Sequence, residues 1–160
     1  MKVAAVQLTS TGNVTENQEL ALAKIREAAG NGARLIVLPE ATAQNFRSGR
    51  LDEQAQTLEG PFATAIQTLA EELEVTVVAG MFCPADTVER DGKTINRVTN
   101  TALIAGPGVL GGYDKIHTYD AFDYRESDTV LAGESLVAFD VDDLIVGVAT
   151  CYDIRFPEQF

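Results

Sequence analysis

The chain has 160 residues, of which 46% are hydrophobic and 22% are charged. This composition indicates one folded domain and excludes general disorder. Its net charge of −12 comes from 24 acidic against 12 basic residues, and such a surface repels nucleic-acid phosphates and anionic lipid headgroups. We therefore expect neither nucleic acid nor a membrane as a partner.

The start of the chain and its cysteines bear on the compartment in which the protein works. Val3–Val6 follows Met1 and Lys2, and this apolar run is too short for the core of a secretory signal. No apolar run approaches the ~20 residues of a membrane span. The two cysteines, Cys83 and Cys151, imply no disulfide framework. We expect a reducing, cytoplasmic setting.

Apolar strands alternate with amphipathic helices in the first half of the chain. Strands are predicted at residues 2–8, 35–38 and 75–80, and helices at residues 15–29 and from Pro61 onward. The run Leu35–Leu38 is continuously apolar, as in strands that are buried on both faces. Pro39 ends this strand, and Glu40 follows it. The β-α-β-α-β order predicts a layered α/β fold.

Strands and turns dominate the second half. Asp91-Gly92 is a strong hairpin signal. Further strands are predicted at residues 94–105, 109–115, 136–141 and 144–149. Residues 116–134 are polar and irregular, which is typical of an active-site loop. Pro157 is expected to open a helix, but the chain ends within one turn of it, so we expect the domain at residues 1–160 to be incomplete at its carboxyl end.

Three residues with complementary chemistry each follow a predicted strand: Glu40, Lys115 and Cys151. Ligands of open α/β sheets bind beyond the carboxyl ends of the strands, so the three side chains can meet there. A partly desolvated carboxylate accepts a proton, an ammonium stabilises an oxyanion, and a thiol supplies the nucleophile. Taken singly, a buried cysteine, an exposed glutamate and a surface lysine are the commoner explanations. Their combination favours a catalytic site.

The base that serves the thiol is not settled by spacing. His117, the single histidine, lies two residues after Lys115, so in extended backbone both side chains share a face. A papain-like cysteine–histidine pair therefore stays open beside a glutamate–cysteine pair. One histidine and two distant cysteines offer no zinc spacing, and no phosphate-binding glycine loop is present. We expect neither a metal nor a cofactor.

Three segments resemble, in order, the signature segments of the nitrilase (carbon–nitrogen hydrolase) superfamily. They are Leu35–Glu40, Tyr113–His117 and Cys151–Glu158. The resemblance covers essentially the whole chain and implies an αββα sandwich with a Glu–Lys–Cys triad. By this resemblance Glu40 is the general base, Cys151 attacks an amide carbonyl to form a thioester, and Lys115 stabilises the oxyanion.

The same resemblance gives roles to further residues. Glu126 matches a second glutamate that orients the substrate or supports Lys115, and the backbone N–H of Tyr152 joins the lysine at the oxyanion. The stretch Cys151–Glu158 is most similar to ω-amidases and deaminated-glutathione amidases, whose substrates are small amides that carry carboxylates. Arg155 is then a candidate for binding such a carboxylate in a bidentate pair. A structural pairing of this arginine with a nearby acid is an equal alternative.

The resemblance also implies a small-molecule amide as the substrate, no cofactor, and a homodimer or larger homo-oligomer. Members of the superfamily are generally longer, so the second half of the sandwich would lie outside these residues. Two other functions stay open. One is a hydrolase of N-carbamoyl compounds or nitriles with the same triad, and the other is a catalytically silent module for assembly or binding.

Overall fold

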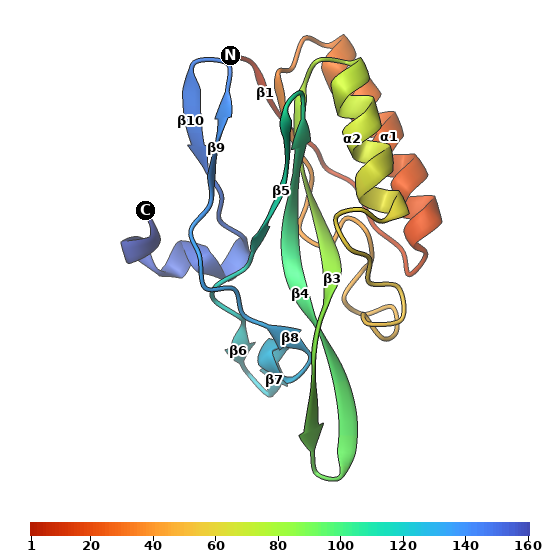
Figure 1. Ribbon diagram of the computed structural model, residues 1–160, viewed down its shortest axis with the longest axis vertical. Coiled ribbons are helices and arrows are strands. Elements are labelled where there is room, and N and C mark those ends of the chain that lie inside the picture. Colours follow the sequence, from red (N-terminus) through yellow and green to blue (C-terminus); the bar gives the residue numbers. More distant parts are fainter.

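A six-stranded sheet forms the centre of the computed structural model, which describes all residues 1–160 (Figure 1). Two helices cover one face of the sheet, and a separate two-stranded hairpin packs on part of the other face (Figure 1). The elements are β1 (Val3–Ala5), α1 (Val14–Gly30), β2 (Leu35–Val37), α2 (Pro61–Glu72), β3 (Thr76–Arg90), β4 (Lys93–Gly106), β5 (Val109–Asp114), β6 (Asp120–Ala121), β7 (Tyr124–Arg125), η1 (Glu126–Asp128), β8 (Val130–Leu131), β9 (Ala138–Val141), β10 (Leu144–Gly147), η2 (Cys151–Arg155) and η3 (Pro157–Gln159).

The direction of the strands determines where their ends meet. The sheet order is β1-β2-β3-β4-β5, with β8 paired to β4. β1, β2 and β3 are parallel neighbours, which requires the helical crossovers α1 and α2. β4 pairs antiparallel with both β3 and β5. Two reversals make β5 parallel to β2, so the carboxyl ends of both strands lie at the same edge of the sheet.

Both helices lie close to their predicted positions because their end signals are clear. α1 begins after Asn13, whose side-chain oxygen accepts the backbone N–H groups of Thr15 and Glu16 at 3.0 and 3.2 Å. α2 carries Pro61 in its first turn, where a missing N–H costs nothing. None of the helices in the structure is long and apolar enough to cross a membrane.

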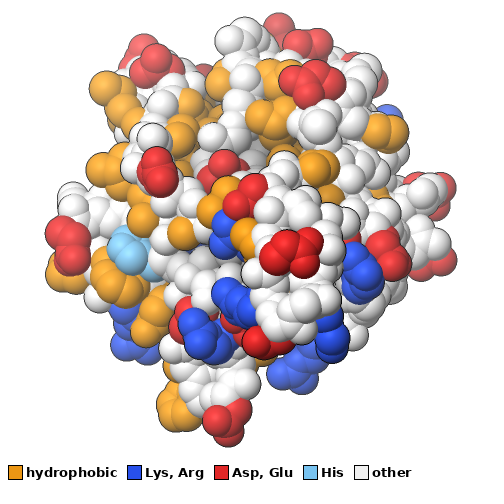
Figure 2. Space-filling view, turned by 60° about the horizontal axis from the view of Figure 1, so that its bottom comes forward, with side chains coloured by type: hydrophobic (Ala, Val, Ile, Leu, Met, Phe, Trp, Pro, Cys, Tyr) orange, Lys and Arg blue, Asp and Glu red, His pale blue; other side chains and the backbone are white.

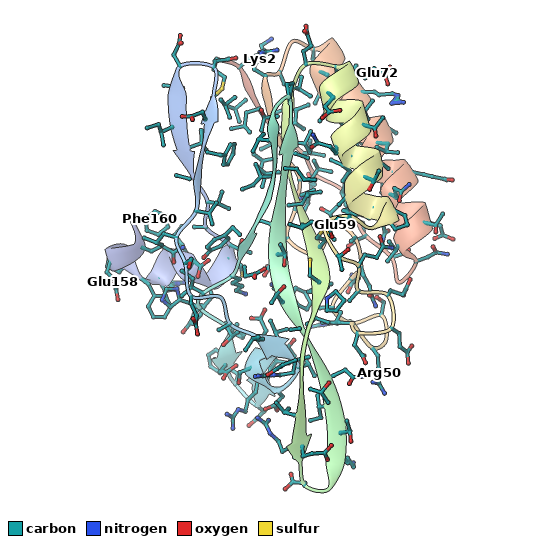
Figure 3. All side chains as sticks on the ribbon, in the orientation of Figure 1. Lys2, Arg50, Glu59, Glu72, Glu158 and Phe160 are labelled. Atoms are coloured by element: carbon teal, nitrogen blue, oxygen red, sulfur yellow. The ribbon has the colours of Figure 1, made fainter.

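The main core lies between the helices and the sheet. Ile25 of α1 and Phe62 and Ile66 of α2 are fully buried against Val77 and Leu103 of the sheet. Burying one such side chain contributes about 1.5–3 kcal/mol. Figure 3 shows side chains filling this space. A smaller cluster on the other face joins the sheet to the β9–β10 hairpin; it consists of Leu35, Ile104, Phe139 and Val141.

The β3–β4 hairpin is much longer than the sequence predicts. β3 was expected over residues 75–80 but continues to Arg90, and the outer part of the hairpin extends beyond the rest of the molecule (Figure 1). The residues of this outer part are mostly exposed on both faces, so they lack the alternation that marks a half-buried strand. The turn itself is at the predicted place. Asp91 and Gly92 have φ values of 52° and 69°, as a two-residue hairpin turn requires.

Several other boundaries differ from those predicted. β1 is shorter than residues 2–8, and β9 and β10 begin or end inside residues 136–141 and 144–149. The expected irregular segment 116–134 contains the short elements β6 to β8. The helix expected at Pro157 is a single 3₁₀ turn, and Glu158 and Phe160 point away from the sheet (Figure 3).

Candidate active site

Lys115 directly follows β5 and is the most deeply buried cation of the site. Its side chain is 2% exposed, and Nζ lies 3.1 Å from Glu40 Oε1 and 2.9 Å from Glu126 Oε2. Burial disfavours the ammonium form, but the hydrogen bond to Glu126 and the charges of both carboxylates outweigh it and raise the pKa of Lys115. The lysine is therefore a fixed positive charge between two carboxylates.

Glu40 follows β2, and its backbone is held against β3. The N–H of Gly80 donates to Pro39 O at 3.2 Å, and a Cβ on Gly80 would lie only 2.5 Å from Ala41 N. Only glycine permits this approach. Ala41 itself has a φ of 57°, so the chain turns sharply after the glutamate. The Glu40 side chain is 22% exposed, which leaves it in reach of a bound molecule.

Glu126 and Asn100 complete the polar cluster from two further elements. Glu126 lies in η1, is 2% exposed, and accepts the backbone N–H of Tyr119 at 2.7 Å. Asn100 of β4 donates through Nδ2 to Glu40 Oε1 at 2.7 Å and to Glu126 Oε1 at 3.1 Å. Sequence reasoning gave Asn100 no role. The available signal was an amide shortly before the apolar run Ala102–Ala105, because an amide in a buried strand needs hydrogen-bond partners.

Cys151 begins the 3₁₀ turn η2 in a strained conformation. Its φ is 51°, in the left-handed region that residues with a Cβ rarely adopt. Thr150 caps the turn, and it forms a reciprocal pair of hydrogen bonds with Asp153. Partial burial and the negative charge of Glu40 raise the pKa of Cys151, and the positive charge of Lys115 opposes them. Burial and the charge of Glu40 both favour the neutral thiol of Cys151 over the thiolate.

His117 belongs to the support of this turn. Its Nδ1 lies 2.8 Å from Asp153 Oδ1, its backbone N–H donates to the same oxygen at 2.9 Å, and its ring stacks on Phe156. The other oxygen of Asp153 accepts from Tyr113 OH at 2.6 Å. Burial disfavours the Asp153 carboxylate, but these hydrogen bonds outweigh it and lower its pKa. The papain-like alternative loses its basis, because the histidine binds Asp153 and does not line the cavity at Cys151.

The polar cluster opens into a cavity of about 480 Å³. The residues that line it are Glu40, Phe46, Arg47, Lys115, Tyr119, Ala121, Phe122, Tyr124, Glu126 and Cys151. This volume suits a small molecule. The structure therefore brings together four of the residues singled out from the sequence, namely Glu40, Lys115, Glu126 and Cys151. No group of three or more histidine, cysteine or acidic side chains is arranged to hold a metal ion.

The side chains of two residues singled out from the sequence do not line the cavity. For Tyr152 the predicted role belongs to the backbone N–H, so the place of the ring leaves that prediction open. The ring of Tyr152 packs edge-on against Tyr119 and Phe156, with ring centroids 5.2 and 5.5 Å apart, and does not line the cavity. Arg155 is exposed, forms no salt bridge, and is also absent from the cavity wall. Its expected place beside the substrate is therefore not supported, because the tight 3₁₀ turn directs it outward. Arg47, from the loop after β2, lines the cavity instead and was missed.

Comparisons with known proteins agree on one family. A model of the carbon–nitrogen hydrolase family matches residues 2–160. The hydrolase Rv0480c of Mycobacterium tuberculosis is 43% identical across the whole chain, which covers 55% of that protein. The deaminated glutathione amidase of a Synechocystis species is 36% identical over 98% of the chain and 59% of that protein. The chain thus spans little more than half the length of these relatives.

A solved structure shows the same fold. It is XC1258 from Xanthomonas campestris, described as a CN-hydrolase superfamily protein with an arsenic adduct in the active site. It aligns with a TM-score of 0.80 and 25% identity, over 98% of this chain and 55% of that one. This agreement confirms the predicted α/β fold class.

Proposed function

Since this chain belongs to the carbon–nitrogen hydrolase family, we propose that it carries the catalytic centre of an amidohydrolase. The observation that carries the proposal is the shared cavity: the thiol of Cys151, the carboxylate of Glu40 and the ammonium of Lys115 all line it. A nucleophile, a base and a cation in one small cavity are the groups that acyl transfer needs.

The first half of the proposed reaction forms a thioester. Glu40 takes the proton of the Cys151 thiol as the sulfur attacks the amide carbonyl carbon, and a C–S bond forms. Lys115 and, by family resemblance, the backbone N–H of Tyr152 stabilise the negative oxygen. The protonated Glu40 then gives its proton to the nitrogen. The C–N bond breaks, and ammonia leaves.

The second half releases the acid. Glu40, again a carboxylate, takes a proton from a water molecule, and the resulting hydroxide attacks the thioester carbonyl. The C–S bond breaks, the sulfur recovers a proton, and a carboxylic acid departs. Glu126 supports this cycle by holding Lys115 in place, since it contacts Nζ through both carboxylate oxygens at 3.2 and 2.9 Å.

The substrate that we propose is a small amide with a carboxylate elsewhere in the molecule. The cavity of about 480 Å³ has room for such a molecule. The name of the Synechocystis relative, a deaminated glutathione amidase, is in line with this class. N-carbamoyl compounds and nitriles are tested as alternatives in the same substrate panel.

Ammonia release from a panel of ω-amides tests the proposal. The Cys151→Ala variant should lose the activity completely while its circular dichroism spectrum stays unchanged. Cys83→Ala is the matched control, because Cys83 is a half-buried thiol outside the cavity, and it should keep the activity. Full activity in Cys151→Ala would contradict the proposal. Carbon dioxide release, or turnover of nitriles alone, would favour the alternatives.

A further inference from the structure

Arg47 is a charged residue of the cavity wall that has no partner. Its guanidinium takes part in no salt bridge, and no hydrogen bond joins its side chain to another residue. The protein has twice as many acidic as basic residues, 24 against 12, so most arginines near the surface find an acid. Arg34, Arg50, Arg90, Arg97 and Arg125 do, whereas Arg26, Arg47 and Arg155 form no salt bridge. Arg47 is exposed, so water solvates its guanidinium, which is free to contact a molecule in the cavity that it lines.

The other charged groups of the cavity pair with one another but leave an excess of negative charge. Lys115 lies between Glu40 and Glu126, so these three side chains together carry one net negative charge. An anionic substrate that enters the cavity meets this charge and is repelled at short range. Arg47 is the one remaining cation of the cavity wall. On the face shown in Figure 2, Lys and Arg side chains gather in the lower half, while few lie in the upper half.

The backbone that leads into Arg47 is held by hydrogen bonds and by aromatic packing. Its N–H donates to Asn45 Oδ1 at 2.9 Å, and Asn45 N donates to Thr11 O at 3.0 Å. The preceding Phe46 packs edge-on against the buried Phe82, with ring centroids 5.1 Å apart. The arginine thus extends from a turn that is anchored to the core.

Tyr124 lines the same cavity as Arg47 and Lys115. Burial and the charge of Glu126 raise the pKa of this tyrosine, while the positive charges of Lys115 and Arg47 oppose the increase. The charges of Lys115 and Arg47 therefore both act on the phenol of Tyr124, which lines the same cavity.

We propose that Arg47 binds the carboxylate of the substrate and so selects amides that carry one. The planar guanidinium offers two parallel N–H donors to a carboxylate, a geometry that lysine cannot provide. The amide end of the same molecule then reaches Cys151. Arg155, the candidate suggested by the family resemblance, does not line the cavity. This inference rests on the proposed amidohydrolase function.

Kinetics on a matched pair of amides test the inference. Succinamate carries an amide and a carboxylate, and butyramide is a neutral analogue of the same chain length. Arg47→Gln should lower kcat/KM for succinamate about 10- to 100-fold, mainly through KM, because it removes a charge-assisted hydrogen-bonded pair. The same variant should change kcat/KM for butyramide by no more than about twofold, since butyramide carries no carboxylate for Arg47 to bind. Arg47→Lys should keep part of the preference for succinamate over butyramide. The control Arg155→Gln should leave kcat/KM unchanged for both substrates.

A binding measurement tests the same contact without turnover. Titration calorimetry with succinate, the product dianion, should give a Kd that is at least about tenfold weaker in Arg47→Gln than in the wild type and unchanged in Arg155→Gln. If Arg47→Gln lowered kcat/KM equally for both amides, or left the Kd for succinate unchanged, the proposed role of Arg47 would be wrong. A wild-type protein that binds succinate through Arg47 but releases no ammonia would instead contradict the proposed function, so the two failures are distinguishable.

Discussion

Lys115 Nζ lies 2.9 Å from Glu126 Oε2, and both side chains are 2% exposed. A buried ion pair of this kind gains little net stability, because desolvation offsets the attraction. The role of this ion pair is to fix the position and the positive charge of Lys115. Glu126 is itself fixed by the backbone N–H of Tyr119 and by Asn100, so the lysine is held by a group that cannot swing away.

Glu126→Gln should therefore weaken catalysis through Lys115. The amide keeps the shape of the side chain but removes one of the two charges that raise the pKa of Lys115. The lysine should lose its proton at lower pH, so the basic limb of the pH profile of kcat/KM should move to lower pH. The rate near neutrality should fall about 10²-fold, as for loss of oxyanion stabilisation. Glu134→Gln, on the exposed part of the neighbouring loop, is the control. A basic limb that stays in place would contradict the role of Glu126.

Gly80→Ala should disturb the site by displacing the backbone that carries Glu40. The added methyl group would meet three backbone atoms, at 2.5 Å from Ala41 N, 2.7 Å from Pro39 O and 2.8 Å from Glu40 C. Backbone cannot move aside cheaply, so we expect a loss of about 1–3 kcal/mol in the free energy of unfolding. The displaced Glu40 should also cost activity, about 10²-fold for a shift near 1 Å.

A second glycine provides the control for this effect. Gly111→Ala places a methyl group where no atom lies within 4 Å, so its stability and ammonia release should match those of the wild type. Thermal unfolding and the activity assay are measured on both variants. Equal behaviour of the two would show that the approach of Gly80 to the Glu40 backbone does not matter.

Asp153→Asn should change how stability depends on pH. The pKa of Asp153 is lowered below its usual 3.8, because the hydrogen bonds it accepts outweigh the effect of burial. A carboxyl with a depressed folded-state pKa adds stability above its unfolded pKa, and this is lost as pH falls through the folded value. Between pH 5 and about pH 3, the urea concentration at the midpoint of unfolding should therefore fall less in the variant than in the wild type.

The same variant should be less stable at neutral pH. The Asn amide nitrogen cannot accept the donors that both Asp153 oxygens receive from His117, Tyr113 and Thr150. Asp140→Asn, at an exposed position of β9, is the control and should follow the wild-type curve. A variant with unchanged acid sensitivity would mean that Asp153 does not carry this component of stability.

The residues that follow strands were the predictable part of the site. Glu40 follows the apolar run Leu35–Leu38 and Pro39, and Lys115 directly follows the predicted strand that begins at Val109, so a shared edge could be derived from pattern and topology. Cys151 required more. It does not end β10 but begins a 3₁₀ turn four residues later, and its left-handed φ leaves no mark in the sequence. Its place after the predicted strand 144–149 singled it out, and the family resemblance gave it the role of nucleophile.

The residues that pattern could not place depend on side-chain direction. Asn100 is a buried polar residue of β4, and only the pairing of β4 with its neighbours turns it toward both carboxylates. Arg47 lies in an irregular loop, where no periodicity relates sequence to direction. Arg155 seemed well placed because it is near Cys151 in the chain, but a tight turn carries it out of the cavity within one turn.

Glu40→Gln should separate thiol ionisation from catalysis. The negative charge of Glu40 helps to raise the pKa of Cys151, so its removal should lower that pKa and increase the thiolate fraction at pH 8. Alkylation by iodoacetamide requires the thiolate, and its rate should rise about tenfold for each unit by which the pKa falls. Ammonia release should nevertheless fall at least about 10²-fold, because the variant lacks the general base.

The second thiol is an internal control for this measurement. Burial raises the pKa of Cys83, and the charges that affect it come from Asp114 and Glu59 rather than from Glu40. Its alkylation rate, followed by mass spectrometry in the same samples, should be the same in wild type and Glu40→Gln. If Cys151 instead alkylates more slowly in the variant, then Glu40 promotes the thiolate already in the resting protein. A base that acts only when substrate is attacked would then be the wrong description of this carboxylate.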